Sequence, residues 1–227
     1  MISKPVAIPA VKNTRMPDHL RSIGEMPSNV SSFYRTIALG EIPESVPSEL
    51  HNRYMGPDRL VSSLATNIIH ELFYFATATK YFASALKKEI GAKAVLLDPL
   101  AGKGYLAKSL QEVGLDCIAT DDNSNGFSKH IENLDALDAL SKYGSKINYL
   151  IISWAHFNSD IDYKLLMKVR NEFPHVTIIN IGEGQGGTTN SIKFWDAAKP
   201  VMKNATNAVN KSYVALPGLH DYVIFLK

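Results

Sequence analysis

The sequence predicts an α/β fold: a doubly wound, mostly parallel sheet that ends in an antiparallel hairpin and carries an N-terminal helical cover. Apolar runs typical of strands buried on both faces alternate with segments of helical periodicity. These runs occupy residues 94–98, 147–153 and 176–181. Two further short strands, 213–215 and 222–226, are joined by a connection that contains Pro-Gly, a spacing typical of a hairpin. We therefore expect the last two strands to pair antiparallel.

The first of these strands leads into a glycine turn, a helix and a second strand. The strand stops at Asp98-Pro99, and Gly102 and Gly104 allow a turn tight enough for a close backbone approach to a ligand. Helical periodicity follows over 104–113, and the next strand spans 116–121. The remaining expected elements are a short third strand near 130–133 and helices at 134–144, 160–173 and 192–207, the last of them bent at Pro200.

The N-terminal part divides into an arm and a helical block. Prolines interrupt residues 1–57, which we expect to form an irregular arm lying on the domain, with one short helix near 31–39. Residues 58–90 are predicted to be helical, with a break near Thr77 and Thr79 and a stop at Gly91. The predicted domain comprises residues 58–227 and includes this block.

Composition narrows the class of protein. A chain of 227 residues with 45% hydrophobic and 20% charged residues suits one globular domain, and a net charge of +2 does not favour a nucleic-acid partner. Cys117 is the only cysteine, so an internal disulfide is excluded and a reducing, cytoplasmic location is expected, with non-classical export left open. The sequence has no signal-peptide pattern and no long apolar run, and its histidines are widely spread. We therefore expect neither a membrane partner nor a metal.

Two carboxylates frame the glycine turn. Asp98 precedes it and Asp121 follows the second strand, at the sheet edge where open α/β sheets bind ligands. Gly102-x-Gly104-x-x-Ala107 fits a dinucleotide-binding fingerprint loosely. Asp98 argues against a dinucleotide, because it would repel a pyrophosphate in the turn. A carboxylate there suits a nucleoside cofactor with a cationic amino-acid end.

Residues 98–104, Asp-Pro-Leu-Ala-Gly-Lys-Gly, resemble the first motif of class I S-adenosylmethionine-dependent methyltransferases, acid-x-Gly-x-Gly-x-Gly. Leu100 stands in place of the first glycine, which puts a close backbone approach at that position in doubt. The resemblance extends from about residue 60 to the C-terminus and concerns the Rossmann-like fold and the cofactor motif. It implies S-adenosylmethionine as the cofactor.

The same resemblance implies roles for individual residues. Asp98 would help to hold the cofactor's amino group, and Asp121 would accept both ribose hydroxyls, with Asp122 as the alternative register. Asp135 would meet the adenine amino group or, equally, cap a helix. The backbone expected to approach the cofactor is that of Leu100, Ala101, Gly102 and Gly104.

The segment after the fourth predicted strand is the expected acceptor side. We interpret Ser153 and Phe157 as relics of the Asn/Asp/Ser-Pro-Pro-aromatic pattern that amino-methylating enzymes resembling this fold carry, and Ser153 is also a candidate cofactor contact. Ala155 and His156 stand where prolines are expected, which puts amino methylation in doubt. His156 is a candidate proton acceptor at neutral pH or, with Trp154, a wall of the cleft.

Glu183 follows the next strand, within a loop rich in glycine. It is expected either to bind a cationic or hydroxyl-bearing substrate or to belong to a flexible solvent loop. Ser153, His156 and Glu183 are therefore the candidate catalytic residues.

The sequence predicts an S-adenosylmethionine-dependent methyltransferase, a transferase whose acceptor is unidentified. The weak net charge favours a small molecule or a protein over nucleic acid. Two alternatives remain open: a catalytically silent binding or interaction protein on the same fold, and a nicotinamide-dependent oxidoreductase.

Overall fold

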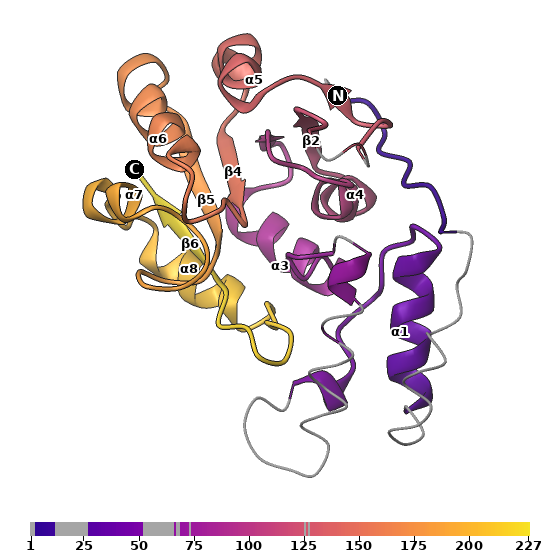
Figure 1. The fold of residues 1–227 in the computed structure, drawn as a ribbon. Coiled ribbons are helices and arrows are strands. Elements are labelled where there is room, and N and C mark those ends of the chain that lie inside the picture. The colour runs from indigo at the N-terminus through magenta and orange to yellow at the C-terminus, as the bar shows by residue number, and fades with distance from the viewer. Residues whose placement is uncertain are drawn as a thin grey trace.

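A six-stranded sheet organises the molecule (Figure 1). The computed structural model describes residues 3–11, 27–51, 66, 69–72, 74–124, 126 and 128–227. The strands are β1 Val95–Asp98, β2 Asp116–Asp121, β3 Glu132–Asn133, β4 Tyr149–Ser153, β5 Thr177–Gly182 and β6 Tyr222–Leu226. Their order is β3-β2-β1-β4-β5-β6, so the strand order reverses between β1 and β4. In a doubly wound sheet this switch point is where ligands bind.

The strand directions confirm the predicted fold class. The first five strands are parallel, and β6 runs antiparallel to β5. The antiparallel partner differs from the one expected, because residues 213–215 form no strand. Tyr213 instead packs its ring against Phe82 and donates a hydrogen bond to Asp221. This segment is therefore used for packing, and β6 pairs with β5 alone.

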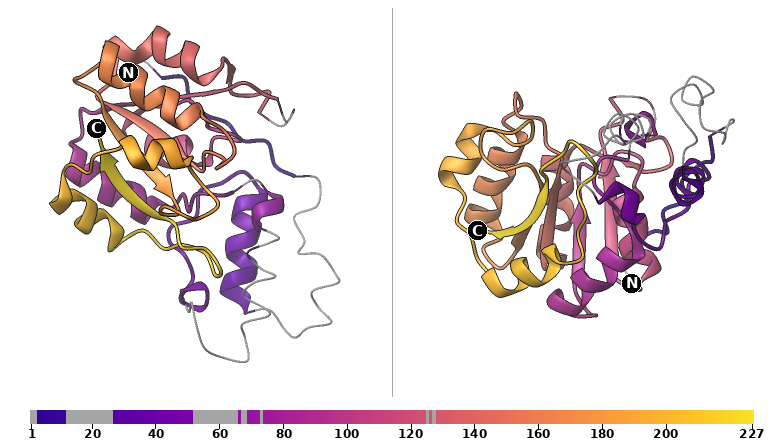
Figure 2. Two further views of the ribbon diagram at one scale, coloured as in Figure 1. Left: turned by 60° about the vertical axis from the view of Figure 1, so that its left-hand side comes forward. Right: turned by 90° about the horizontal axis from the view of Figure 1, so that it is seen from below.

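Helices cover both faces of the sheet, as the two turned views show (Figure 2). They are α1 Ser28–Ala38, α3 Lys80–Ile90, α4 Tyr105–Glu112, α5 Ala136–Tyr143, α6 Ile161–Glu172, α7 Ile192–Ala197 and α8 Lys203–Asn210. One apolar cluster takes side chains from α1, α3, α4 and α8, and a second takes them from α5, α6 and α7. Leu96 belongs to the first cluster and Leu97 to the second. This alternation explains why the strand sequences read as continuous apolar runs.

The described N-terminal residues share the core of the sheet. Val6, Ile8 and the apolar face of α1 belong to the same cluster as α3 and α4. Two side chains of α4 fasten the end of α1: the Tyr105 hydroxyl donates to the carbonyl of Ile37, and Lys108 donates to that of Gly40. The predicted boundary between residues 57 and 58 lies outside the described residues, and so do residues 58–65 of the predicted helical block.

Two helix boundaries illustrate the local physics. The expected break before α3 is confirmed, because Thr79 caps the helix and accepts a hydrogen bond from the Phe82 N–H. The single helix expected over 192–207 is wrong, since α7 and α8 are separate. Pro200 cannot continue a helix, and the backbone around it pairs with β6, where Val201 N–H binds the carbonyl of Phe225.

No helix among the described residues has the length and apolar character needed to cross a bilayer.

We expect Thr79→Ala to lower the free energy of unfolding by about 1 kcal/mol, because it removes the acceptor of the first turn of α3. Thr36→Ala is the matched control, since the Thr36 hydroxyl only bonds back to a carbonyl within α1. Urea denaturation of both variants is the measurement. Equal losses in the two variants would contradict the capping role.

Candidate functional site

The turn between β1 and α4 is fastened to the neighbouring strand. Ala101 N–H binds the carbonyl of Thr120 over 3.1 Å, and Gly102 N–H binds Oδ2 of Asp121 over 2.9 Å. Gly104 N–H closes the turn on the carbonyl of Ala101 at 2.7 Å. Gly102 and Gly104 have φ angles of 54° and 83°, in the left-handed region that glycine adopts at little cost. The glycine spacing seen in the sequence therefore has a direct conformational cause.

Gly104 is also required by packing. A Cβ at this position would lie 2.8 Å from side-chain carbons of Ile131 and of Val6. The N-terminal segment therefore packs, through Val6, against the start of α4 and the turn before it.

Asp98 is the most unusual polar residue of the site. Only 1% of its surface is exposed, and its Oδ1 has no hydrogen-bond partner. Burial raises the pKa of Asp98 to about 7, opposed by a hydrogen bond from the Leu100 N–H and reinforced by the charge of Asp121. It ends β1 beside β4, at the switch point of the sheet. A buried carboxylate with a free oxygen can accept a cationic donor.

Leu100 does not obstruct the turn. Its partly buried side chain packs with the second apolar cluster, on the opposite face of the sheet from Asp98 and Leu96. A leucine is therefore accommodated where the resembling motif has its first glycine.

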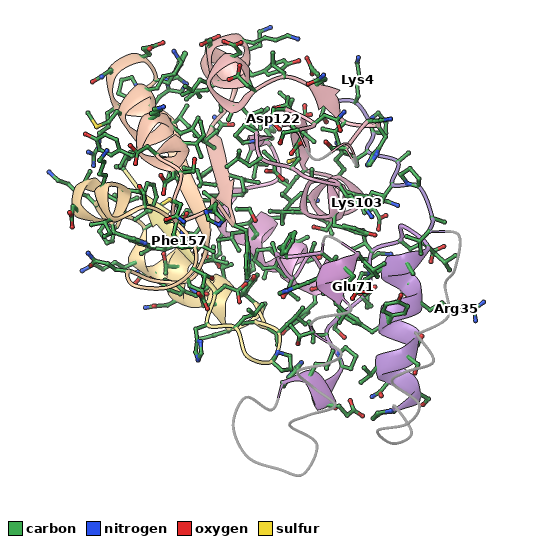
Figure 3. The ribbon with its side chains drawn as sticks, in the orientation of Figure 1. Lys4, Arg35, Glu71, Lys103, Asp122 and Phe157 are labelled. Carbon is green, nitrogen blue, oxygen red and sulfur yellow. The ribbon has the colours of Figure 1, made fainter. Side chains whose placement is uncertain are left out.

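Asp121 and Asp122 have different environments. Asp121 is partly buried and accepts three hydrogen bonds, from Gly102 N–H, Asn123 N–H and the Ser128 hydroxyl. A carboxylate has about four lone-pair sites, so a diol would compete with one of these donors. Asp122 is exposed and accepts only from the Ser124 N–H. Figure 3 shows Asp122 and Lys103 on the side of the molecule where β2 and α4 lie.

Asp135 caps α5. It is exposed, and its carboxylate accepts hydrogen bonds from the backbone of Leu137 and Asp138, which lower its pKa. The helix-capping interpretation of this residue is the one that the structure displays. A contact with adenine stays a prediction.

Ser153 and His156 differ in accessibility. Ser153 is the partly buried last residue of β4, whereas His156 is exposed and stacks on Phe157 with ring centroids 4.8 Å apart. Phe157 is 46% exposed, and Figure 3 shows it well separated from Lys103 and Asp122. The aromatic residue expected to stack on an acceptor therefore lies toward solvent.

Glu183 organises the loop that follows β5. Its Oε2 accepts from the N–H and hydroxyl of Thr188, and its Oε1 accepts from the His220 N–H. Partial burial raises the pKa of Glu183, but the hydrogen bonds and the nearby His220 outweigh it and hold the pKa below its usual value. Glu183 is therefore charged at neutral pH and is a poor proton acceptor.

The three candidate catalytic residues are related through the backbone. Within the described part of the chain, no hydrogen bond joins Ser153, His156 and Glu183 to one another. The backbone of His156 pairs with Thr189, whose hydroxyl accepts from the Glu183 N–H. The loops after β4 and β5 are thus linked.

Sequence reasoning missed an aromatic cluster at the end of β4. Trp154 has a φ of 52° and contacts Phe75 and His70, with ring centroids 5.6 Å and 5.7 Å away. The only sequence signal was the position of Trp154 immediately after Ser153. Phe75 and His70 lie far earlier in the chain, and the sequence analysis assigned that block to packing or to a cover of the cleft.

The described residues contain no group of three or more His, Cys, Asp or Glu side chains that could hold a metal ion. Cys117 is buried, and burial raises the pKa of its thiol, with further contributions from Asp98 and Asp116.

No family model matches the sequence, and a comparison with curated proteins finds no match. Among solved structures, the chain is similar to 1,6-didemethyltoxoflavin-N1-methyltransferase of Burkholderia thailandensis, solved with 1,6-didemethyltoxoflavin and S-adenosylhomocysteine bound. The match has 13% identity and a TM-score of 0.40, and covers 82% of this chain and 98% of that one. Mitomycin 7-O-methyltransferase MmcR matches with 11% identity and a TM-score of 0.38, over 86% of this chain and 62% of that one.

Both TM-scores are low, so the fold assignment rests on the sheet itself. The strand order and the antiparallel last strand agree with the class I methyltransferase arrangement that the resemblance implies.

Asp98→Asn should change how stability depends on pH. The unfolded Asp98 is ionised above about pH 4, whereas the folded one keeps its proton up to about pH 7. The wild type therefore binds an extra proton when folded and loses stability as pH rises. Relative to D98N, we expect a loss of roughly 3 kcal/mol between pH 5 and pH 8. Thermal unfolding across this range checks it, with exposed Asp122→Asn as the control, and parallel curves for wild type and D98N would contradict it.

Proposed function

We propose that this protein is an S-adenosylmethionine-dependent methyltransferase. The observation that carries the proposal is the free Oδ1 of Asp98, buried at the switch point of the sheet. An ammonium group there would supply the missing partner and stabilise the charged carboxylate. S-adenosylmethionine carries such a group on its amino-acid end.

The residues of the turn fit the rest of this cofactor. Gly102 and Gly104 have left-handed backbones, and Ala101 is held in the same tight turn by its hydrogen bonds, so the backbone of the turn allows a close approach. Asp121 would bind the ribose hydroxyls, in exchange for part of its hydrogen bonding to Ser128 and Asn123. A nicotinamide dinucleotide fits less well, because a pyrophosphate bound in the turn would meet the carboxylate of Asp98.

When bound, the cofactor would supply an electrophilic methyl group on its sulfonium. The chain would contribute alignment of the acceptor and exclusion of water. Ser153 ends the strand next to β1 and would orient the acceptor. His156 is the candidate proton acceptor. Charged Glu183 would act through its fixed negative charge and through the loop that it orders.

Isothermal titration calorimetry tests the cofactor. We expect S-adenosylmethionine and S-adenosylhomocysteine to bind and NAD to give no heat. Because the ammonium favours ionised Asp98, affinity for S-adenosylhomocysteine should rise about tenfold between pH 5.5 and pH 7, and D98N should abolish this dependence. Binding of NAD with no response to either methyl-cycle ligand would refute the proposal and favour the oxidoreductase.

The two neighbouring aspartates provide a matched comparison. We expect Asp121→Ala to weaken S-adenosylhomocysteine binding about ten- to a hundredfold, because it removes an acceptor for ribose and the anchor of Gly102. Asp122→Ala, an exposed change one residue away, should weaken it less than about threefold. A larger loss in D122A would move the ribose contact to Asp122.

A further inference from the structure

Three aromatic side chains, His70, Phe75 and Trp154, contact one another at the carboxyl end of β4, and we call this group the aromatic wall. His70 and Phe75 have ring centroids 5.1 Å apart, and both rings contact Trp154. Trp154 follows β4, the strand adjacent to β1 and Asp98. It packs with the apolar cluster that also includes Ala101 of the glycine turn. Trp154 therefore lies on the face of the sheet that contains Leu96, at the carboxyl end of the strand next to β1.

The wall carries hydrogen-bonding atoms that the protein does not use. Nε1 of Trp154 and Nε2 of His70 are both buried and have no hydrogen-bond partner. An indole N–H can only donate, so its missing partner is an acceptor atom. Burial lowers the pKa of His70, which keeps its ring neutral and compatible with an uncharged ligand.

The backbone holds Trp154 in place at a cost. Its φ of 52° lies in the left-handed region, which disfavours a bulky side chain. The backbone N–H of Trp154 nevertheless donates a hydrogen bond to the carbonyl of Ile181 on β5. The backbone N–H of Asn190 donates to the carbonyl of Ala155, the residue after Trp154. These bonds fix the direction in which the indole leaves the strand. Phe75 completes the wall with a ring that is 37% exposed.

We propose that this wall binds the methyl acceptor, and that the acceptor is a planar aromatic or heteroaromatic small molecule with an oxygen or nitrogen that accepts a hydrogen bond from Trp154. That the bound molecule is a methyl acceptor rests on the proposed function. The aromatic site itself is argued from the ring contacts and from the indole N–H of Trp154, which has no hydrogen-bond partner among the described residues. It places recognition on His70, Phe75 and Trp154, and not on exposed Phe157.

The test uses the two tryptophans of the chain as internal reporters. Trp195 also has a buried, unpartnered Nε1, but it packs with the other apolar cluster, on the opposite face of the sheet. In the ¹⁵N-labelled protein, Trp195→Phe assigns the two indole N–H signals. Addition of 2-naphthol, a planar probe with a hydroxyl oxygen, should shift the Trp154 signal saturably and leave the Trp195 signal in place.

Two comparisons sharpen the result. Decahydro-2-naphthol keeps the oxygen but loses the flat rings, and it should bind at least about tenfold more weakly. Trp154→Phe keeps a ring but removes the N–H, and should weaken 2-naphthol binding about three- to tenfold, whereas W195F should not. Equal affinity for the two probes, a response of Trp195 alone, or unchanged affinity in W154F would each overturn the inference.

The outcome is separable from that of the cofactor titration. If S-adenosylhomocysteine binds and 2-naphthol does not, the aromatic site is wrong while the proposed function survives. If 2-naphthol binds as described and neither methyl-cycle ligand does, the proposed function is overturned and the wall remains an aromatic-binding site.

Discussion

The link between Asp121 and Gly102 is the constraint on which the site depends. Through it, the end of β2 holds the turn that follows β1, so that two neighbouring strands and the start of α4 share one fixed geometry. The same turn is pressed from outside by Val6 and Ile131, which leave no space for a side chain at Gly104. The N-terminal segment therefore helps to shape the glycine turn, although it lies far from this turn in sequence.

Asp98 shows the opposite behaviour, because nothing in the chain satisfies it fully. A buried carboxylate with a free oxygen opposes folding when it is charged, and the fold tolerates it at the point where the strand order reverses. The strained backbone of Trp154 lies just beyond the adjacent strand. Unfavourable features of this kind gather where a ligand can compensate for them, and these two lie at the carboxyl ends of neighbouring strands.

In the loops after β4 and β5, the polar side chain of Glu183 serves to hold the backbone of these loops together. The carboxylate of Glu183 accepts hydrogen bonds from Thr188 and His220. The backbone of Thr189, in the same loop as Glu183, pairs with that of His156. The aromatic wall around Trp154, by contrast, keeps two buried nitrogen atoms without a hydrogen-bond partner among the described residues. The proposed recognition of the acceptor therefore uses stacking on the aromatic wall and one hydrogen bond donated by the indole N–H of Trp154.

The sequence by itself determined the strands, the glycine turn and the two carboxylates around it, because apolar runs, glycine spacing and capping residues such as Thr79 act over a few neighbouring positions. Tertiary structure decided what depends on distant partners. Packing of Tyr213 on Phe82 replaced the expected hairpin strand. The meeting of His70, Phe75 and Trp154 and the burial of the free Asp98 oxygen follow from how separate segments fold together, and no local pattern records them.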